Sequence, residues 1–125
     1  MLDPAAGTEG VMRFVLETVE AKATGACPPL VVGVGVGGTF DSVGKLAKQA
    51  LVRTIGTPAH DGRAAELETA LLEAVNATGI GPAGLGGLTT ALAVHVLTAP
   101  CHIAALPVAV NLGCSAMRSV TVELG

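Results

Sequence analysis

No Asp, Glu, Lys or Arg occurs between Ala74 and Met117, and this uncharged stretch is the strongest constraint on how the chain folds. Proline and glycine interrupt it repeatedly, so it holds no apolar span of about twenty residues of the kind that crosses a bilayer. Apolar segments without charge must therefore be buried, partly against further polypeptide or a partner subunit. We expect no membrane insertion and a homo-oligomer.

The composition narrows the class of protein further. The length of 125 residues fits a single domain, residues 1–125, and 50% hydrophobic residues with only 2% aromatic ones imply a core of small side chains. A net charge of −3 excludes the basic surface of a nucleic-acid-binding protein. The N-terminus lacks the features of a signal peptide, and three cysteines without paired spacing suit a reducing compartment. We expect a cytoplasmic protein.

The periodicity of apolar residues predicts the elements of the fold. Helical spacing indicates three helices, at about Val11–Lys22, Val43–Val52 and Arg63–Asn76. Continuous β-branched or alternating runs indicate strands at Leu30–Val36, Thr89–Leu97, Ile103–Leu112 and Ser119–Leu124. The expected fold class is α+β (mixed α/β), with about three helices packed on a small sheet of about four strands.

A glycine motif follows the first strand. Gly33, Gly35 and Gly38 have the G-x-G-x-x-G spacing of a dinucleotide-binding turn. Such a site also needs an acidic residue at the end of a second strand about twenty residues further on, and here Asp61 lies in a turn-rich loop instead. We therefore interpret the glycines as a tight turn that lets backbone pass close to another anion or a buried cofactor.

Cysteines and histidines are the candidates for chemistry. Free cysteines are most often core residues, but Cys27 and Cys114 stand beside proline or glycine at loop positions, where the backbone can open around a cluster. No C-x-x-C occurs, which argues against a zinc ribbon. A lone histidine such as His102 is usually structural, and His95 is still more so. The acids Glu66, Glu68 and Glu73 read as the solvated face of a helix, without a catalytic role.

Four segments resemble a known family in the same order along the chain. The family is that of the α subunit, or N-terminal domain, of class I (iron–sulfur) fumarate hydratases and L(+)-tartrate dehydratases. The segments are MLDPAAGTEGVMRFVLETV, GACPPLVVGVGVGGTFDSVGKLAKQAL, ELETALLEAVNATGIGPAGLGGLTTALAVHV and HIAALPVAVNLGCSAMR. The resemblance also assigns VVGVGVGGT to the family's own glycine turn rather than to a dinucleotide site.

The resemblance implies a hydro-lyase that dehydrates malate to fumarate or tartrate to oxaloacetate at a [4Fe–4S] cluster. Three cysteines hold the family's cluster and leave one iron open as a Lewis acid. Cys27 matches the cysteine of the C-P-P motif, Cys114 the one after P-V-A-V-N, and His102 the active-site histidine of the T-H-I-A-type motif. We therefore expect the two thiols to converge on one cavity and His102 to face it.

The sequence departs from the family at three places. The first cluster cysteine and the β part are absent, Leu88 replaces a lysine, and Cys101 stands where threonine or arginine is common. The resemblance thus implies partners: a small dicarboxylate substrate, a β subunit or domain and the upstream α region. The alternative is a stand-alone non-catalytic domain that uses its apolar face as a protein-binding surface.

Overall fold

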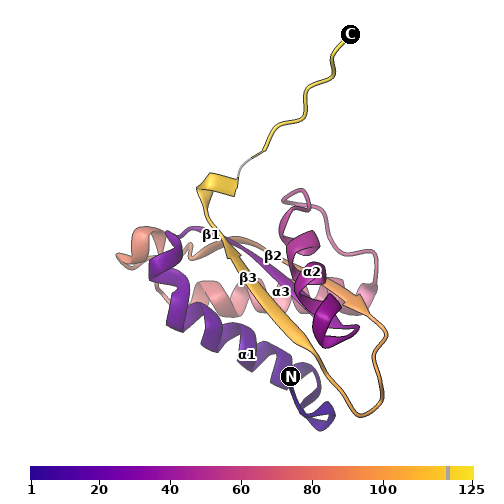
Figure 1. The fold of residues 1–125 in the computed structure, drawn as a ribbon. Helices are drawn as coiled ribbons and strands as arrows, with labels where there is room; N and C mark the ends of the chain where they lie inside the picture. The colour runs from indigo at the N-terminus through magenta and orange to yellow at the C-terminus, as the bar shows by residue number, and fades with distance from the viewer. Residues whose placement is uncertain (118) are drawn as a thin grey trace.

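A computed structural model describes residues 1–117 and 119–125 (Figure 1). In this part of the chain the α-helices are α1 (Gly7–Lys22), α2 (Phe40–Leu51) and α3 (Gly62–Ala77), and the strands are β1 (Leu30–Gly37), β2 (Ala91–Ala99) and β3 (Val108–Gly113). Short 3-10 turns join them. None of the described helices is long and apolar enough to span a membrane.

Side-chain caps explain where two of the helices begin. Thr39 and Ser42 form a reciprocal capping box at the start of α2, and Thr39 is the N-cap residue. Asp61 caps α3 by accepting a hydrogen bond from the backbone N–H of Arg63 at 3.2 Å. Asp61, the acidic residue considered above for a contact with a ribose, is therefore the N-cap of a helix.

The sheet has the strand order β2-β1-β3 and lies between two helical layers (Figure 1). β1 runs parallel to β2 and antiparallel to β3. Helices α1 and α3 share a core with the side chains of one face, where Val32 and Val34 are fully buried. Helix α2 covers the opposite face. The expected α+β class is confirmed.

Two glycines of β1 allow α2 to lie directly on the sheet. A Cβ added at Gly35 would lie 2.5 Å from the carbonyl oxygen of Val43 and 2.7 Å from the nitrogen of Ala47, both backbone atoms of α2. Gly33 meets the same helix one turn further along. The G-x-G spacing therefore serves close packing of helix on strand, which is one reason for glycine inside a strand.

The prediction of four strands was wrong by one. Residues 119–125 are extended but unpaired and project away from the sheet (Figure 1). An alternating segment becomes a strand only where it pairs with a neighbouring strand, and this segment pairs with none of the described strands. The third predicted strand is also shorter: it begins at Val108, because a turn closed by the bond from Ala105 N–H to the His102 carbonyl precedes Pro107.

Candidate functional site

Cys27 and Cys114 lie at the same end of the sheet although 86 positions separate them in sequence. Cys27 ends a short 3-10 turn just before β1, and Cys114 follows the last residue of β3. The antiparallel register pairs Val31 with Gly113, so the start of β1 and the end of β3 are neighbours. The topology thus brings the two matched cysteines to one edge.

The three cysteines are free thiols, and none follows the general tendency of free cysteines to be fully buried in the core. Cys27 and Cys101 are exposed and Cys114 is half-buried. Cys27 adopts a left-handed conformation, φ 58° and ψ 72°, which is rare for a residue with a side chain. Strained backbone of this kind costs free energy and is often found at functional sites.

An apolar cavity of about 490 Å³ adjoins Cys114. Its lining comes from the starts of β1 and β2, the end of α2 and the loop after it, and includes Val31, Leu92, Leu51 and Ile55. Arg53 is the one charged residue in the described lining. Cys27 is not part of the lining, so convergence of both thiols on a single cavity stays a prediction.

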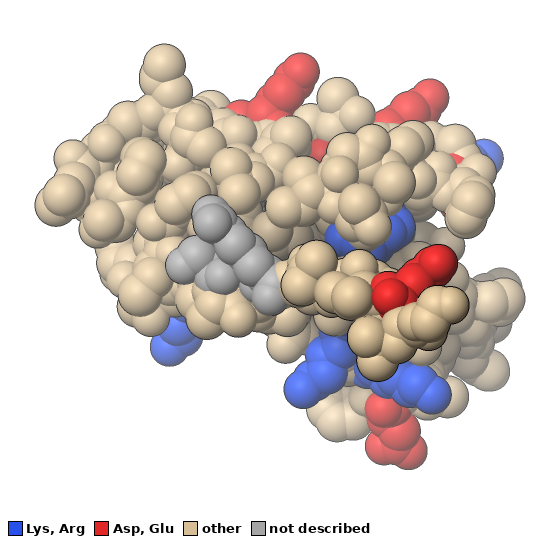
Figure 2. Space-filling model, turned by 90° about the horizontal axis from the view of Figure 1, so that it is seen from above, with Lys and Arg blue, Asp and Glu red and all other residues tan. Residues whose placement is uncertain are grey.

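A glycine-rich loop, residues 79–87, packs beside Cys27. The backbone N–H of Ala83 donates to the carbonyl of Pro28 at 2.9 Å, next to the cysteine. A Cβ at Gly81, whose φ is 70°, would collide with the backbone of Gly86. The loop also presents Leu85, which is 88% exposed. Seen from above, this end of the molecule shows mostly uncharged residues (Figure 2).

His102 lies at the opposite end of the sheet, so the expectation that it faces the cysteines is wrong within one copy of the chain. Pro100 accepts a hydrogen bond from Gly38 N–H at 3.1 Å, which places this loop beyond the end of β1. The six residues of β3 then separate it from Cys114 by about 20 Å at 3.3 Å per residue. The imidazole is exposed, and its Nδ1 accepts from Ala104 N–H at 3.0 Å.

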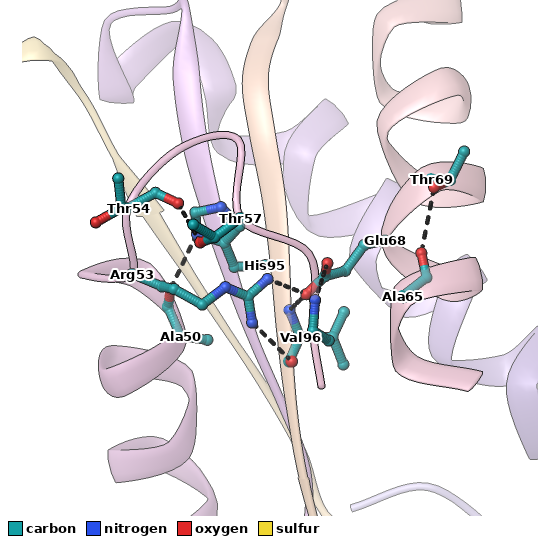
Figure 3. A network of polar contacts seen from close by, with 10 residues as sticks. Ala50, Arg53, Thr54, Thr57, Ala65, Glu68, Thr69, His95 and Val96 are labelled. Atoms are coloured by element: carbon teal, nitrogen blue, oxygen red, sulfur yellow. Dashed lines mark hydrogen bonds and ion pairs between the residues drawn. The ribbon is translucent and has the colours of Figure 1, made fainter. Parts of the chain in front are cut away.

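A buried polar network was missed by the sequence analysis. Glu68 is only 7% exposed, although it was expected on a solvated face. Its carboxylate forms an ion pair with Arg53 and accepts backbone N–H bonds from Val96 at 2.8 Å and Ala59 at 3.1 Å (Figure 3). The signal was the helical register: Ala64, Glu68, Leu71 and Val75 are the buried positions of α3.

His95 lies in the same region with a structural role. It is 2% exposed, and its Nδ1 lies 3.1 Å from the carbonyl oxygen of Ala50 at the end of α2 (Figure 3). Burial lowers the pKa of His95 below its ordinary value of 6.5, and the positive charge of Arg53 adds to this effect. The imidazole is therefore held neutral.

The described residues contain no cluster of three or more His, Cys, Asp or Glu side chains able to hold a metal ion. The groups that the resemblance assigns to chemistry are thus two thiols at one end of the sheet and the exposed imidazole of His102 at the other.

Comparison with known proteins gives consistent matches. The family model described as fumarate hydratase (fumerase) matches residues 1–123. A putative L(+)-tartrate dehydratase subunit alpha of Methanocaldococcus jannaschii is 51% identical over 118 residues, which are 94% of this chain and 41% of that protein. The L(+)-tartrate dehydratase subunit alpha of Escherichia coli K12 is 41% identical over 97% of this chain and 40% of that protein. The chain spans about two fifths of the length of these relatives.

Proposed function

Because the chain belongs to the fumarate hydratase (fumerase) family, we propose that it is one part of a hydro-lyase that reversibly dehydrates a 2-hydroxy dicarboxylate. The substrate pair is malate and fumarate, or tartrate and oxaloacetate. The observation that carries the proposal is the meeting of Cys27 and Cys114 at one end of the sheet. The shortness of the chain relative to its relatives means that other polypeptide must complete the enzyme.

The two cysteines fit part of the ligand set of a [4Fe–4S] cluster. Thiolates are the ligands of such clusters, and both thiols here are free and lie at the same sheet end. Cys27 and Cys114 would supply two ligands, and a third cysteine would come from outside this chain. When bound, the cluster supplies an open iron that acts as a Lewis acid on the substrate hydroxyl. A reducing cytoplasm would keep the thiols available.

Substrate recognition requires more cationic groups than the described lining of the cavity offers. A dicarboxylate needs cations or N–H donors, and Arg53 is the charged residue of the described cavity lining. Its guanidinium is already bound to Glu68 and to the backbone carbonyl of Val96. We therefore infer that the β subunit or domain brings the residues that hold the substrate carboxylates.

His102 is the candidate for holding or moving a proton. Nδ1 already accepts a backbone hydrogen bond, which leaves Nε2 as the nitrogen that faces outward. An imidazole with one nitrogen fixed in this way is oriented for acid–base work or for positioning a carboxylate. Its distance from Cys114 means that it cannot serve the same substrate molecule as the cysteines of its own copy.

Reconstitution with iron and sulfide under anaerobic conditions tests the cysteine assignment. We expect visible iron–sulfur absorbance and bound iron in the chain assembled with its β partner, and loss of both in Cys27→Ser and Cys114→Ser. Cys101→Ser is the matched control, since this exposed cysteine lies at the other end of the sheet. Retention of the full iron content in Cys27→Ser would contradict the assignment.

A stand-alone binding domain is the second candidate. Several apolar side chains near the cysteine end are more than half exposed: Val52, Ile55, Leu85 and Leu88. Such a patch is typical of a surface that another protein covers. This function would require no iron. A chain that takes up none with its β partner present, yet still binds that partner, would favour it.

A further inference from the structure

A histidine of β2 ties the end of α2 to the sheet. His95 is buried, and its Nδ1 lies 3.1 Å from the carbonyl oxygen of Ala50 (Figure 3). Because a carbonyl oxygen can only accept a hydrogen bond, Nδ1 is the donor. The same carbonyl accepts the backbone N–H of Arg53, the second residue after the helix, at 3.2 Å. One carbonyl group therefore joins the sheet, the end of α2 and the loop that follows it.

The ion pair of Arg53 and Glu68 fixes the same loop to the next residue of β2. The guanidinium lies 3.5 Å from the carbonyl oxygen of Val96, and the carboxylate accepts the Val96 N–H at 2.8 Å (Figure 3). The buried Nε of Arg53 has no hydrogen-bond partner in the described part of the chain. An apolar pair of similar size often stabilises a fold as well as a buried ion pair does, and a stranded donor is unfavourable. Stability alone therefore does not account for charged groups at this position.

Leu51, the last residue of α2, connects this anchor to the end of β3. A Cβ added at Gly33 would lie 2.8 Å from the Leu51 Cβ, and one added at Gly113 would lie 3.1 Å from its Cδ1. Leu51 thus packs directly on the backbone of β1 and β3. Gly113 immediately precedes Cys114, and residues 51–55 line the apolar cavity together with that cysteine. The end of α2 and its loop therefore form one wall of the cavity beside this thiol.

We propose that this buried network positions the thiol of Cys114. His95, Arg53 and Glu68 hold the end of α2 on β2. Leu51, fixed by that helix end, keeps the last residue of β3 in place, and Cys114 follows directly. Packing and hydrogen bonds around a ligand group hold it in a productive geometry. The three network residues act through Leu51 and are positioning residues, and the inference rests on the proposed function, which makes Cys114 a cluster ligand.

The reactivity of the Cys114 thiol in the full chain tests the proposal without iron. Cys27→Ser combined with Cys101→Ser leaves Cys114 as the single thiol. Its rate of modification by dithiobis(nitrobenzoate) then reports how often the cavity wall opens. His95→Leu removes the donor to Ala50 and should raise this rate about fivefold, which corresponds to the roughly 1 kcal/mol of a typical hydrogen bond. Asparagine has nearly the size of leucine but can donate from its amide, so His95→Asn should keep a rate close to that of the wild type.

Two further variants keep the proposal testable if His95→Leu does not fold. Glu68→Gln preserves the shape of the side chain but removes its charge, and it should also raise the rate at Cys114. Leu51→Ala removes the contact with Gly113 and leaves the network intact. Because His95 and Leu51 act along one chain of contacts, their double variant should react no faster than the faster of the two single variants.

Controls separate positioning from a general loosening of the fold. Val15→Ala weakens the core on the other face of the sheet, and it should leave the rate at Cys114 unchanged. A chain whose single thiol is Cys27 should react equally fast with and without His95→Leu. Circular dichroism and urea unfolding verify that each variant is folded.

Three results would overturn the proposal. These are an unchanged rate at Cys114 in folded His95→Leu or Glu68→Gln, an equal rise at Cys27 or in Val15→Ala, and independent, multiplying effects in the double variant. Failure to bind iron in a chain that shows the expected rise at Cys114 would instead count against the proposed function alone.

Discussion

Glu68→Ala tests whether the buried ion pair holds the fold together. The carboxylate is the common partner of a guanidinium and of two backbone N–H groups, one on β2 and one in the loop before α3. Alanine preserves the helix but leaves all three donors without their acceptor. The loss therefore acts on α3, on the sheet edge and on the α2–α3 loop at once.

The magnitude follows from how deeply the pair is buried. Removing one partner of a buried ion pair costs about 3–5 kcal/mol. The side chain of Arg53 is 20% exposed and can recover some hydration, which favours the lower part of that range. Adding about 1 kcal/mol for the stranded N–H of Val96 gives a total near 4 kcal/mol. This is a large share of the roughly 5–15 kcal/mol by which domains are stable.

Urea unfolding followed by circular dichroism at pH 7 measures this loss. Glu66→Ala is the matched control, because Glu66 is an exposed acid two positions away on the same helix, and it should change stability by less than about 0.5 kcal/mol. Glu68→Gln keeps one acceptor and should fall between the two. If Glu68→Ala unfolds at the same urea concentration as Glu66→Ala, the network does not stabilise the fold and the reasoning is refuted.

Three further changes test the packing, the sheet edge and the buried imidazole. Gly35→Ala forces a methyl group against the backbone of α2 and should lower the unfolding free energy by about 2–3 kcal/mol. Gly44→Ala is the control: a Cβ there has no neighbour within 4 Å, so alanine should raise the unfolding free energy by about 0.5–1 kcal/mol. Denaturant unfolding of both variants measures the difference. Asn76→Ala should cost about 2–3 kcal/mol and accelerate amide exchange at the start of β2, and equal exchange rates would contradict this role. The lowered pKa of His95 means that the unfolded chain takes up the proton first, so the free energy of unfolding falls as the pH drops below 6.5. His95→Gln should reduce the difference in unfolding free energy between urea melts at pH 7.5 and pH 5.5, and an unchanged difference would contradict this role.

Helices and the central strand could be predicted because their signals are local. The β-branched run gave β1 almost residue for residue, and the apolar spacing gave α3 within one residue at each end. Glu68 shows the limit of residue type as a guide. A glutamate on an amphipathic helix is usually solvated, and only its register with Leu71 and Val75 places it on the buried face.

Strand pairing was harder to predict because it depends on partners far away in sequence. Residues 119–125 carry the same alternation as a strand, yet they pair with none of the described strands. The glycines of β1 show the opposite case. Their spacing suggested a ligand-binding turn, but the space beside them is occupied by α2. No local sequence pattern predicts this contact between strand and helix.

The separation of His102 from Cys114 follows from elementary strand geometry. A strand that lies between two residues holds them apart by its own length, about 3.3 Å for each position. His102 and Cys114 are close in sequence, but β3 lies between them and therefore places them at opposite ends of the sheet. Cys27 and Cys114 lie at the same end of the sheet because β1 and β3 run in opposite directions, so that the start of one strand is beside the end of the other.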